Sequence, residues 1–198
     1  MTPAGEPSAK REVRARLLAA RRALGVEARL RAAEQLTRRV LALPELTAAR
    51  TVAAYSSFGT EPATTAVLAE LSSRGATVLL PVVRPDLDLD WAIYAEPGPP
   101  ADATGLWVPP GDRQGVQAVG AADAVVVPAL AVGASGTRLG RGGGSYDRAL
   151  ARVRPGIPVI ALLYDGELLD EVPAEPHDRA VTVAVQPSGV TRFGVVPA

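Results

Sequence analysis

The part of this 198-residue chain best suited to chemistry runs from Gly136 to Leu150 and reads GTRLGRGGGSYDRAL. Its glycines lie between an apolar strand pattern and a helix pattern. A glycine-rich turn at such a junction exposes backbone N–H groups, and the helix N-terminus adds partial positive charge. Arg138 and Arg141 can neutralise phosphate oxygens, and Asp147 can hold Mg²⁺ together with those oxygens. The segment therefore predicts a polyphosphate site.

This segment matches neither of the two common nucleotide-binding motifs. It lacks the Gly-Lys-Ser/Thr of the Walker A loop, and the spacing of the dinucleotide fingerprint after a first strand is absent. A tight strand-to-helix turn is the plain alternative for the glycines. The pair Arg138 and Arg141, with Asp147 close behind, favours anion binding over a passive turn.

Composition excludes several kinds of catalyst. With no cysteine, thiolate nucleophiles, disulfides and cysteine-ligated zinc are excluded. The single histidine, His177, leaves no pair of histidines for a metal and disfavours a histidine-based triad. Ionic chemistry would rest on carboxylates, arginines, tyrosines and the single lysine, Lys10.

The distribution of charge and hydropathy limits the classes of partner that we expect. The formal net charge is zero, but residues 10–39 carry ten basic residues and three glutamates. Two amphipathic helices with solvated arginine faces explain this excess better than nucleic-acid binding, because aromatic interleaving and known nucleic-acid motifs are absent. Neither a membrane-length apolar run nor the apolar segment of a signal peptide is present, so we expect a cytoplasmic protein without membrane contact.

Hydrophobic periodicity supplies the elements that must position these residues. Near-continuous apolar strands alternate with helices, which predicts one α/β domain over residues 1–198, with residues 1–8 disordered. The expected architecture is three-layer α/β/α with a mainly parallel, Rossmann-like sheet. Strands are expected at about 51–56, 76–83, 87–94, 123–130, 158–164 and 180–185, and helices at about 9–23, 27–43, 62–74, 146–153 and 167–171.

The string RLGRGGGSYDR resembles the signature of the 5-formyltetrahydrofolate cyclo-ligase family. Lys10-Arg-Glu-Val-Arg14 resembles the family's N-terminal Lys-x₃-Arg, which contacts ATP. Tyr55 to Glu61 resembles its strand and folate-contacting glutamate. Further matching pieces follow in the family's order, so that the resemblance spans roughly residues 9–193: Pro81, the Trp107 loop, the strand ending Pro128-Ala-Leu, and His177-Asp178.

The resemblance implies a fold similar to sugar-phosphate isomerases and CoA-transferases, and a defined reaction. The family cyclises 5-formyltetrahydrofolate to 5,10-methenyltetrahydrofolate with Mg²⁺ and ATP, through an N5-iminium phosphate, and releases ADP and phosphate. ATP and 5-formyltetrahydrofolate are the expected partners, Mg²⁺ the expected cofactor, and the protein is expected to be a monomer.

The resemblance also assigns roles by position. Arg141 and Tyr146 are the expected catalytic residues, and Asp147 and Asp178 the expected Mg²⁺ ligands. The folate is expected to meet Ser56, Glu61, Trp107, Arg141, Gly142, Gly143, Gly144 and Ser145. ATP is expected to meet Lys10, Arg14, Arg138, Leu139, Gly140, Arg141, Gly142, Gly143, Gly144, Ser145 and Tyr146.

Plainer interpretations stand beside some of these roles. The less favoured alternatives are that Lys10 is a solvated lysine at a helix start, that Glu61 is a charge at a helix N-terminus, and that Asp178 is a turn residue. Trp91 could stack on a ligand ring, but its place in an alternating strand favours core packing at least as much.

Three departures from the family pattern bear on substrate. Val132-Gly133 stands where members carry Phe-Asp, Ser145 where an aromatic is common, and Thr182 where an aspartate is usual. The alternative is therefore a divergent paralogue of the family. Such a paralogue is either an enzyme similar to sugar-phosphate isomerases and CoA-transferases, or a non-catalytic module that binds folate or nucleotide.

Overall fold

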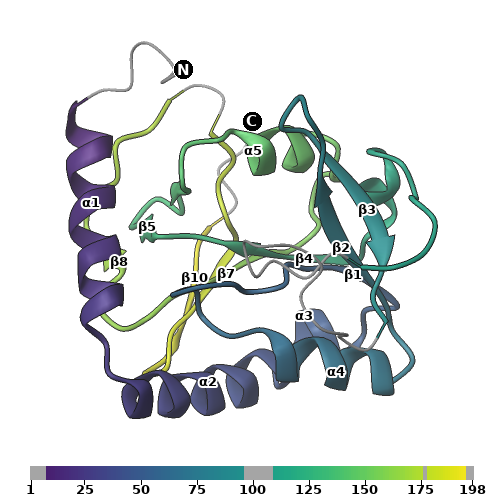
Figure 1. Ribbon diagram of the computed structural model, residues 1–198, viewed down its shortest axis with the longest axis horizontal. Coiled ribbons are helices and arrows are strands. Elements are labelled where there is room, and N and C mark those ends of the chain that lie inside the picture. Colours follow the sequence, from purple (N-terminus) through teal and green to yellow (C-terminus); the bar gives the residue numbers. More distant parts are fainter. Residues whose placement is uncertain (1–7, 96–108, 176–177, 195–198) are drawn as a thin grey trace.

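The computed structural model describes residues 8–95, 109–175 and 178–194, and a seven-stranded sheet crosses its centre (Figure 1). The strand order is β10-β9-β7-β4-β1-β2-β3. The inner strands pair in parallel, whereas β3 and β10 add antiparallel edges. The strands are β1 (Thr51–Ala53), β2 (Thr77–Val83), β3 (Leu89–Ile93), β4 (Ala124–Pro128), β7 (Val159–Leu162), β9 (Val183–Val185) and β10 (Val190–Arg192).

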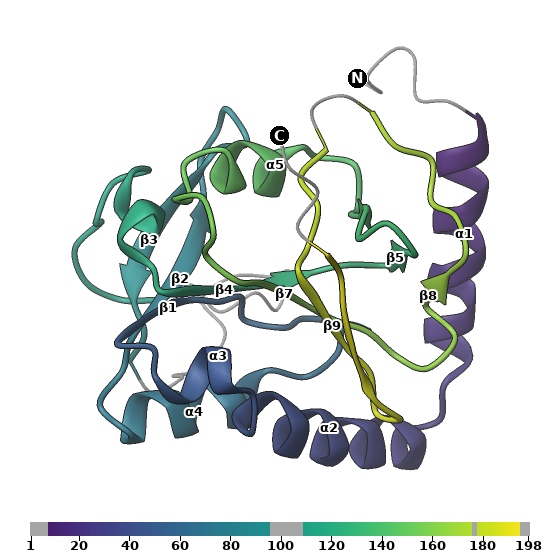
Figure 2. The ribbon, with the colours of Figure 1, turned by 180° about the vertical axis from the view of Figure 1, so that it is seen from behind.

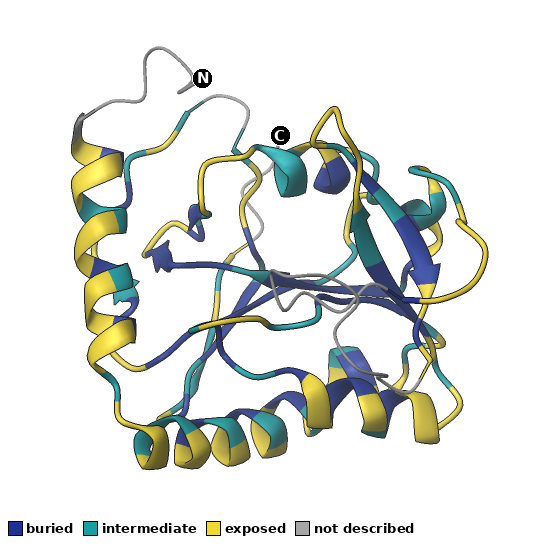
Figure 3. Cartoon of the chain, viewed as in Figure 1, coloured by how far each residue is buried: buried dark blue, intermediate teal, exposed yellow. Residues whose placement is uncertain are grey.

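Helices cover both faces of this sheet, as the apolar strand patterns predict. On one face α2 (Val26–Leu41), α3 (Pro44–Thr47) and α4 (Thr65–Ser73) bury leucines and valines against alternate strand residues. On the other, α5 (Ser145–Leu150) and the 3₁₀ helix η1 (Ala118–Ala121) do the same. Figure 3 shows the strands buried and the outer helix faces exposed. The predicted three-layer α/β/α architecture is confirmed.

A second, smaller sheet lies beyond the carboxyl end of β4. Its order is β6-β5-β8, formed by Arg138–Leu139, Ala131–Gly133 and Leu168–Leu169. Helix α1 (Ser8–Ala23) packs against it, with Leu17 buried in a cluster with Leu130 and Leu139. Figure 2 shows α1 beside β5 and β8 from behind. The helix therefore stands at the edge where the parallel strands end.

The chain reverses its winding at the neighbouring strands β1 and β4. After β1, helix α4 crosses one face to reach β2, whereas after β4 the chain passes through α5 on the opposite face to β7. In sheets of this kind, ligands bind in the crevice outside the carboxyl ends of the strands at such a switch point. The segments after β1 and β4 are therefore the place to look for a site.

Several expected elements agree with the structure to within a few residues, including the first two helices. One is wrong: residues 167–171 form no helix, because Leu168–Leu169 pair with β5 and Glu167 is held by a distant arginine. Helix α4 begins at Thr65 rather than at Pro62, so Glu61 is not in its first turn. Leu30 is an apolar residue of α2 that the fold leaves 60% exposed. Among the described residues, no helix has the length and apolarity needed to cross a membrane.

Candidate active site

A cavity of about 300 Å³ opens at the switch point. Its walls come from α1, from the segments after β1 and β4, from residues 138–147, and from Glu175 and Asp178. The sequence-predicted site residues meet here, although they come from segments far apart in the chain: Lys10, Arg14, Ser56, Glu61, the whole run from Arg138 to Asp147, and Asp178. Trp107 lies outside the described residues.

Arg138 is a buried cation under the glycine-rich loop. Its Nη2 donates to Asp147 Oδ1 at 2.8 Å, and its Nη1 reaches the Pro128 carbonyl at 3.5 Å. The guanidinium also lies 5.8 Å from the centre of the Tyr146 ring. Within the described parts of the chain its Nε has no hydrogen-bond partner. A buried donor without an acceptor is costly, so a ligand oxygen would be favoured beside it.

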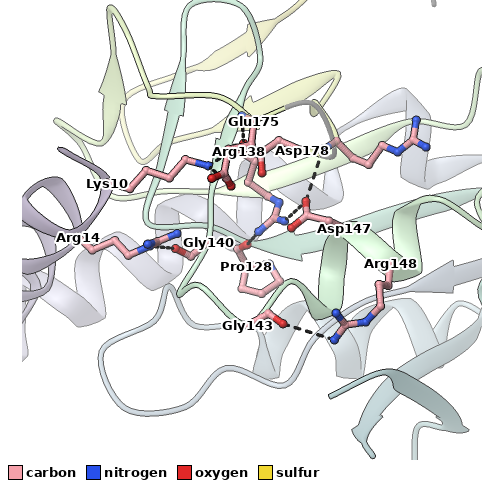
Figure 4. Close-up of polar contacts among 11 residues, drawn as sticks. Lys10, Arg14, Pro128, Arg138, Gly140, Gly143, Asp147, Arg148, Glu175 and Asp178 are labelled. Atoms are coloured by element: carbon pink, nitrogen blue, oxygen red, sulfur yellow. Dashed lines mark hydrogen bonds and ion pairs between the residues drawn. The ribbon is translucent and has the colours of Figure 1, made fainter. Parts of the chain in front are cut away.

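Lys10 is also buried, which excludes a solvated lysine at the helix start. Its Nζ donates to Glu175 Oε2 and to Asp178 Oδ2, both at 2.9 Å (Figure 4). Burial disfavours its charge, but these two carboxylates outweigh that effect and raise the pKa of Lys10 above its ordinary value. Lys10 therefore stays charged, and its two ion pairs bring Glu175 and Asp178 to the site.

Arg14, one helical turn after Lys10, closes on the loop. Its Nε donates to the Gly140 carbonyl at 2.7 Å. The loop turns sharply at Gly142, which has φ +103°, and at Gly144, which has φ +65°. Side chains rarely adopt φ +103°, so this turn favours glycine there. Lys10 and Arg14 reach the site from the same helix, as Figure 4 shows.

The backbone of the loop is rich in unused donors. Within the described residues, no N–H group from Gly140 through Asp147 donates a hydrogen bond to the protein. Successive N–H groups in such a turn form a concave anion site. Because α5 has only six residues, this property belongs to the loop more than to a helix dipole. The loop thus has the backbone geometry of an anion-binding turn, and binding of phosphate there stays a prediction.

Arg141 joins the loop to the other side of the cavity. Its Nε lies 3.4 Å from Glu61 Oε1, and its guanidinium stacks 4.6 Å from the centre of the Phe58 ring. Glu61 Oε2 also accepts the N–H of Phe58 at 3.2 Å. Glu61 is therefore a buried carboxylate turned into the cavity, and the alternative of a helix-terminal charge is excluded.

Burial raises the pKa of two acidic groups in the cavity wall, the carboxyl of Glu61 and the phenol of Tyr146. The pKa of the Glu61 carboxyl is raised, because burial disfavours the carboxylate more than the Phe58 N–H, Arg141 and Arg21 favour it. The pKa of Tyr146 is raised by burial and by the nearby Glu61 charge. Tyr146 is therefore a neutral phenol at physiological pH, able to donate a hydrogen bond but unsuited to act as a base.

The two expected metal ligands are close but already paired. Asp147 accepts from Arg138, and Asp178 accepts from Lys10. The N–H of Arg179 also reaches Asp147 Oδ1 at 3.4 Å, so the Asp147 carboxylate lies beside the backbone of the residue that follows Asp178. No group of three or more potential metal ligands occurs among the described residues. The pair fits Mg²⁺ only if phosphate oxygens and water supply the other ligands, which is how Mg²⁺ is commonly held in nucleotide sites.

Two of the three departures from the family pattern lie away from the cavity. Val132 and Gly133 are buried in β5, between β6 and β8. Thr182 uses its hydroxyl at the start of β9, where it accepts from Val159 N–H and donates to Val159 O. Only Ser145 lines the cavity. Trp91 packs in the core and does not line the cavity, so its ligand-stacking role is wrong.

Sequence reasoning missed several residues of the cavity wall. Phe58, Tyr55, Glu175 and Arg21 all line it. Arg21 had a signal in the sequence, because it follows Lys10 and Arg14 at a spacing that places all three on one face of α1. Glu175 had none, since its partner Lys10 is 165 residues away.

The fold and the cavity define an α/β protein of the doubly wound class, with its ligand pocket at the carboxyl edge of the parallel strands. The family model of the 5-formyltetrahydrofolate cyclo-ligases matches residues 6–187. The 5-formyltetrahydrofolate cyclo-ligase of Mycolicibacterium smegmatis is 43% identical over 186 residues, covering 91% of this chain and 95% of that protein. The chain therefore belongs to the 5-formyltetrahydrofolate cyclo-ligase family of enzymes.

Other relatives and solved structures are consistent with this family and its fold. The enzyme of the same name from Escherichia coli K12 is 28% identical, over 86% of this chain and 96% of that protein. The NMR structure of Aquifex aeolicus 5,10-methenyltetrahydrofolate synthetase superposes with a TM-score of 0.79 at 27% identity, covering 96% of this chain and 95% of that one. The Mycoplasma pneumoniae synthetase has a TM-score of 0.71 at 19% identity, over 88% and 96% of the two chains, and supports the fold.

Proposed function

We propose that this protein uses ATP to cyclise 5-formyltetrahydrofolate to 5,10-methenyltetrahydrofolate, releasing ADP and phosphate. Family membership and the Mycolicibacterium smegmatis relative support the reaction. The observation that carries the proposal for this chain is the contact between Arg141 and Glu61. It joins a loop suited to phosphate to a carboxylate suited to the N–H groups of a pterin, so the two substrates would meet at Arg141.

The phosphate side is cationic and rich in donors. Lys10, Arg14 and Arg138 converge on one cavity with the unused N–H groups of residues 140–147. Charge-assisted hydrogen bonds of this kind are the strong ones in phosphate recognition. Lys10 would act as a compact point charge. Arg138, anchored by Asp147, presents an Nε that has no hydrogen-bond partner among the described residues. This side would hold the triphosphate.

The folate side is more apolar, with one buried acceptor. Glu61 is 9% exposed, and a buried carboxylate reads a pair of N–H donors well. Ser56 and Phe58 lie in the same wall, close to Glu61 in the chain. Pro81 and Leu89 extend the wall with apolar surface on which a flat ring can lie. This side would hold the pterin.

The proposed reaction needs positioning more than proton transfer. The formyl oxygen attacks the γ-phosphorus as the bond to ADP breaks, which gives the N5-iminium phosphate. N10 then adds to the former formyl carbon and loses its proton, the C–O bond breaks, and phosphate leaves with that oxygen. Arg141 would stabilise the charge on the transferring phosphoryl group, and the neutral phenol of Tyr146 would donate a hydrogen bond to it. Phosphoryl transfer is catalysed chiefly by such positioning and charge stabilisation.

Mg²⁺ fits this site together with the nucleotide. Asp147 and Asp178 would hold it once phosphate oxygens compete for their partners, Arg138 and Lys10. When bound, the ion would neutralise charge on the β- and γ-phosphates. Without the ion, Asp147 and Asp178 would continue to orient the side chains of Arg138 and Lys10.

The test follows the absorbance of methenyltetrahydrofolate with purified protein, 5-formyltetrahydrofolate and Mg-ATP. We expect product only in the complete mixture, and none when ATP is omitted or replaced by an analogue whose γ-phosphate cannot be transferred. Arg16→Ala is the matched control for arginine variants, because Arg16 is exposed on α1 and does not line the cavity. Lack of product in the complete mixture would overturn the proposal.

The same experiment separates the alternatives. A relative of the sugar-phosphate isomerases or CoA-transferases would not consume ATP, and product formed without ATP would remove the phosphoryl-transfer mechanism. A non-catalytic module would bind 5-formyltetrahydrofolate or ATP in calorimetry, without turnover.

A further inference from the structure

Arg21 is a buried cation that the proposed reaction does not use. It is 2% exposed, and its Nε and Nη2 donate to the two carboxylate oxygens of Glu167 at 2.7 and 2.8 Å. Nη2 also donates to the Ala129 carbonyl at 2.6 Å. This pair ties α1 to the segments after β4 and β7. A buried ion pair contributes little net stability over an apolar pair, but losing one partner is severely destabilising.

Tyr164 continues the contact toward the folate side. Its backbone N–H donates to Glu167 Oε2 at 2.7 Å, and its ring lies 5.5 Å below the Arg21 guanidinium. Its hydroxyl donates to the backbone carbonyl of Glu61 at 3.3 Å. Arg21, Glu167, Tyr164 and Glu61 therefore form an unbroken series of contacts.

The hydroxyl of a second tyrosine, Tyr55, holds the next backbone carbonyl along the chain, that of Pro62. Tyr55 lies in the segment after β1, and its hydroxyl donates to that carbonyl at 3.1 Å. Burial raises the pKa of both tyrosines, so both hydroxyls keep their protons and act as donors. Two consecutive carbonyls, those of Glu61 and Pro62, are thus fixed from two different strand ends. The backbone that carries the Glu61 side chain is thereby held in place, while Phe58 N–H and Arg141 contact its carboxylate.

We propose that Arg21, Glu167 and Tyr164 form a positioning network that fixes Glu61 for recognition of the pterin. The inference rests on the proposed function, and none of the three residues touches a reacting atom. The network anchors α1 at the same time, so the helix that carries Lys10 is set against the folate side.

The electrostatic surroundings of Glu61 are consistent with this role. Arg21 from α1 and Arg141 from the loop both favour its ionised form. Among the described residues, the other titratable groups that interact with it are the phenols of Tyr55, Tyr146 and Tyr164, from the segment after β1, from α5 and from the segment after β7. Removing Arg21 would leave Arg141 as the cation that favours the carboxylate among these groups.

The kinetic test uses Tyr164→Phe, which removes the hydroxyl and keeps the ring. We expect the KM for 5-formyltetrahydrofolate to rise about fivefold, the loss of one neutral hydrogen bond, with the KM for ATP unchanged. Tyr94→Phe is the matched control, because Tyr94 is buried in the core and does not line the cavity. In a Glu61→Gln background, Tyr164→Phe should raise that KM much less. An equal effect in both backgrounds, or equal changes in both KM values, would overturn the proposal.

A measurement without ligand keeps this test separate from the proposed function. Arg21→Met/Glu167→Gln removes both buried charges together and keeps an oxygen for the Tyr164 N–H. Carbon-13 NMR would follow the titration of the Glu61 carboxyl, assigned with Glu61→Gln. We expect the midpoint to move to higher pH in the double variant, because a cation that favours the carboxylate is gone. An unchanged midpoint would overturn the network, whereas a wild-type protein that makes no methenyltetrahydrofolate would overturn only the proposed function.

Discussion

Arg141 Nε lies 3.4 Å from Glu61 Oε1, and this contact joins the glycine-rich loop to the turn after β1. The two residues are 80 positions apart and belong to the two sides of the cavity. Phe58 supports both, with its ring under the guanidinium and its N–H on the carboxylate. In the proposed reaction, the phosphate and the formyl group would meet at this pair.

Arg138→Ala should weaken ATP binding selectively. Arg138 is buried on the phosphate side, and losing a hydrogen bond to a charged group costs about 1.5–3 kcal/mol, so the KM for ATP should rise about 10- to 150-fold. The KM for 5-formyltetrahydrofolate should change much less. Steady-state kinetics with each substrate varied in turn measures both values.

Arg16→Ala, on the exposed face of α1, controls for the loss of an arginine and should leave both KM values unchanged. Equal increases in the two KM values for Arg138→Ala would contradict its assignment to the phosphate side.

Glu61→Gln should make the folded protein more stable and weaken its binding of 5-formyltetrahydrofolate. Because the folded state raises the pKa of Glu61, it binds the proton more readily than the unfolded chain does. The contribution of Glu61 to stability is therefore greatest at low pH, and it falls as pH rises from the pKa of Glu61 in the unfolded chain through its pKa in the folded protein. Glutamine removes that cost at neutral pH, and the melting temperature should rise by about 2–4 °C for each kcal/mol recovered.

The same variant should raise the KM for 5-formyltetrahydrofolate at neutral pH. In the wild type, kcat/KM for this substrate should fall at acid pH as Glu61 takes up its proton, and Glu61→Gln should lack that limb. A melting temperature that drops, together with an unchanged acid limb, would show that Glu61 is not the titrating group.

Gly142→Ala and Gly143→Ala form a matched pair within the loop. Gly142 has φ +103°, where a side chain is strained by about 1–3 kcal/mol, so its variant should raise the KM for ATP about 5- to 150-fold. Gly143 lies outside that backbone region, and an added Cβ would lie 3.5 Å from Ser145 Oγ, an ordinary contact. Its effect should be clearly smaller. The opposite order would mean that the space above Gly143, and not the turn at Gly142, limits nucleotide binding.

Divalent metal should bind only with nucleotide. Asp147 and Asp178 are each paired with a cation in the described structure. In the proposed site, a phosphate would compete for those cations and release the two carboxylates. Electron paramagnetic resonance of Mn²⁺ should show little binding to the protein alone and clear binding when ATP is added beyond what ATP binds by itself. Asp147→Asn should reduce that increment. Tight Mn²⁺ binding without nucleotide would contradict this account.

The sequence predicted the parts of the fold that have long, regular patterns. The periodicity of α1 and α2 and the apolar runs of β4 and β7 each specify their element locally, because burial of one helix stripe or of a whole strand leaves a clear signature. The strands of the smaller sheet have only two or three residues each, too few for any period to show. That sheet was missed for this reason.

The residues of the candidate site also fall into two groups, those that the sequence predicted and those that it did not. The glycine-rich loop, Lys10, Arg14 and Glu61 were predicted from their motifs, and the structure brings them to one cavity. Glu167 was assigned to a helix because its local pattern fits one, whereas its partner Arg21 is 146 residues away. Contacts over such separations are set by the fold, and a single sequence carries no local signal of them.

The most direct test of the central claim follows the formyl oxygen itself. The substrate is 5-formyltetrahydrofolate labelled with ¹⁸O in the formyl group, turned over by the wild-type protein with Mg-ATP. If the formyl oxygen attacks the γ-phosphorus, mass spectrometry of the released inorganic phosphate will find one ¹⁸O atom per methenyltetrahydrofolate formed. Unlabelled phosphate, with the ¹⁸O released into water, would contradict phosphorylation of the formyl group in this cavity.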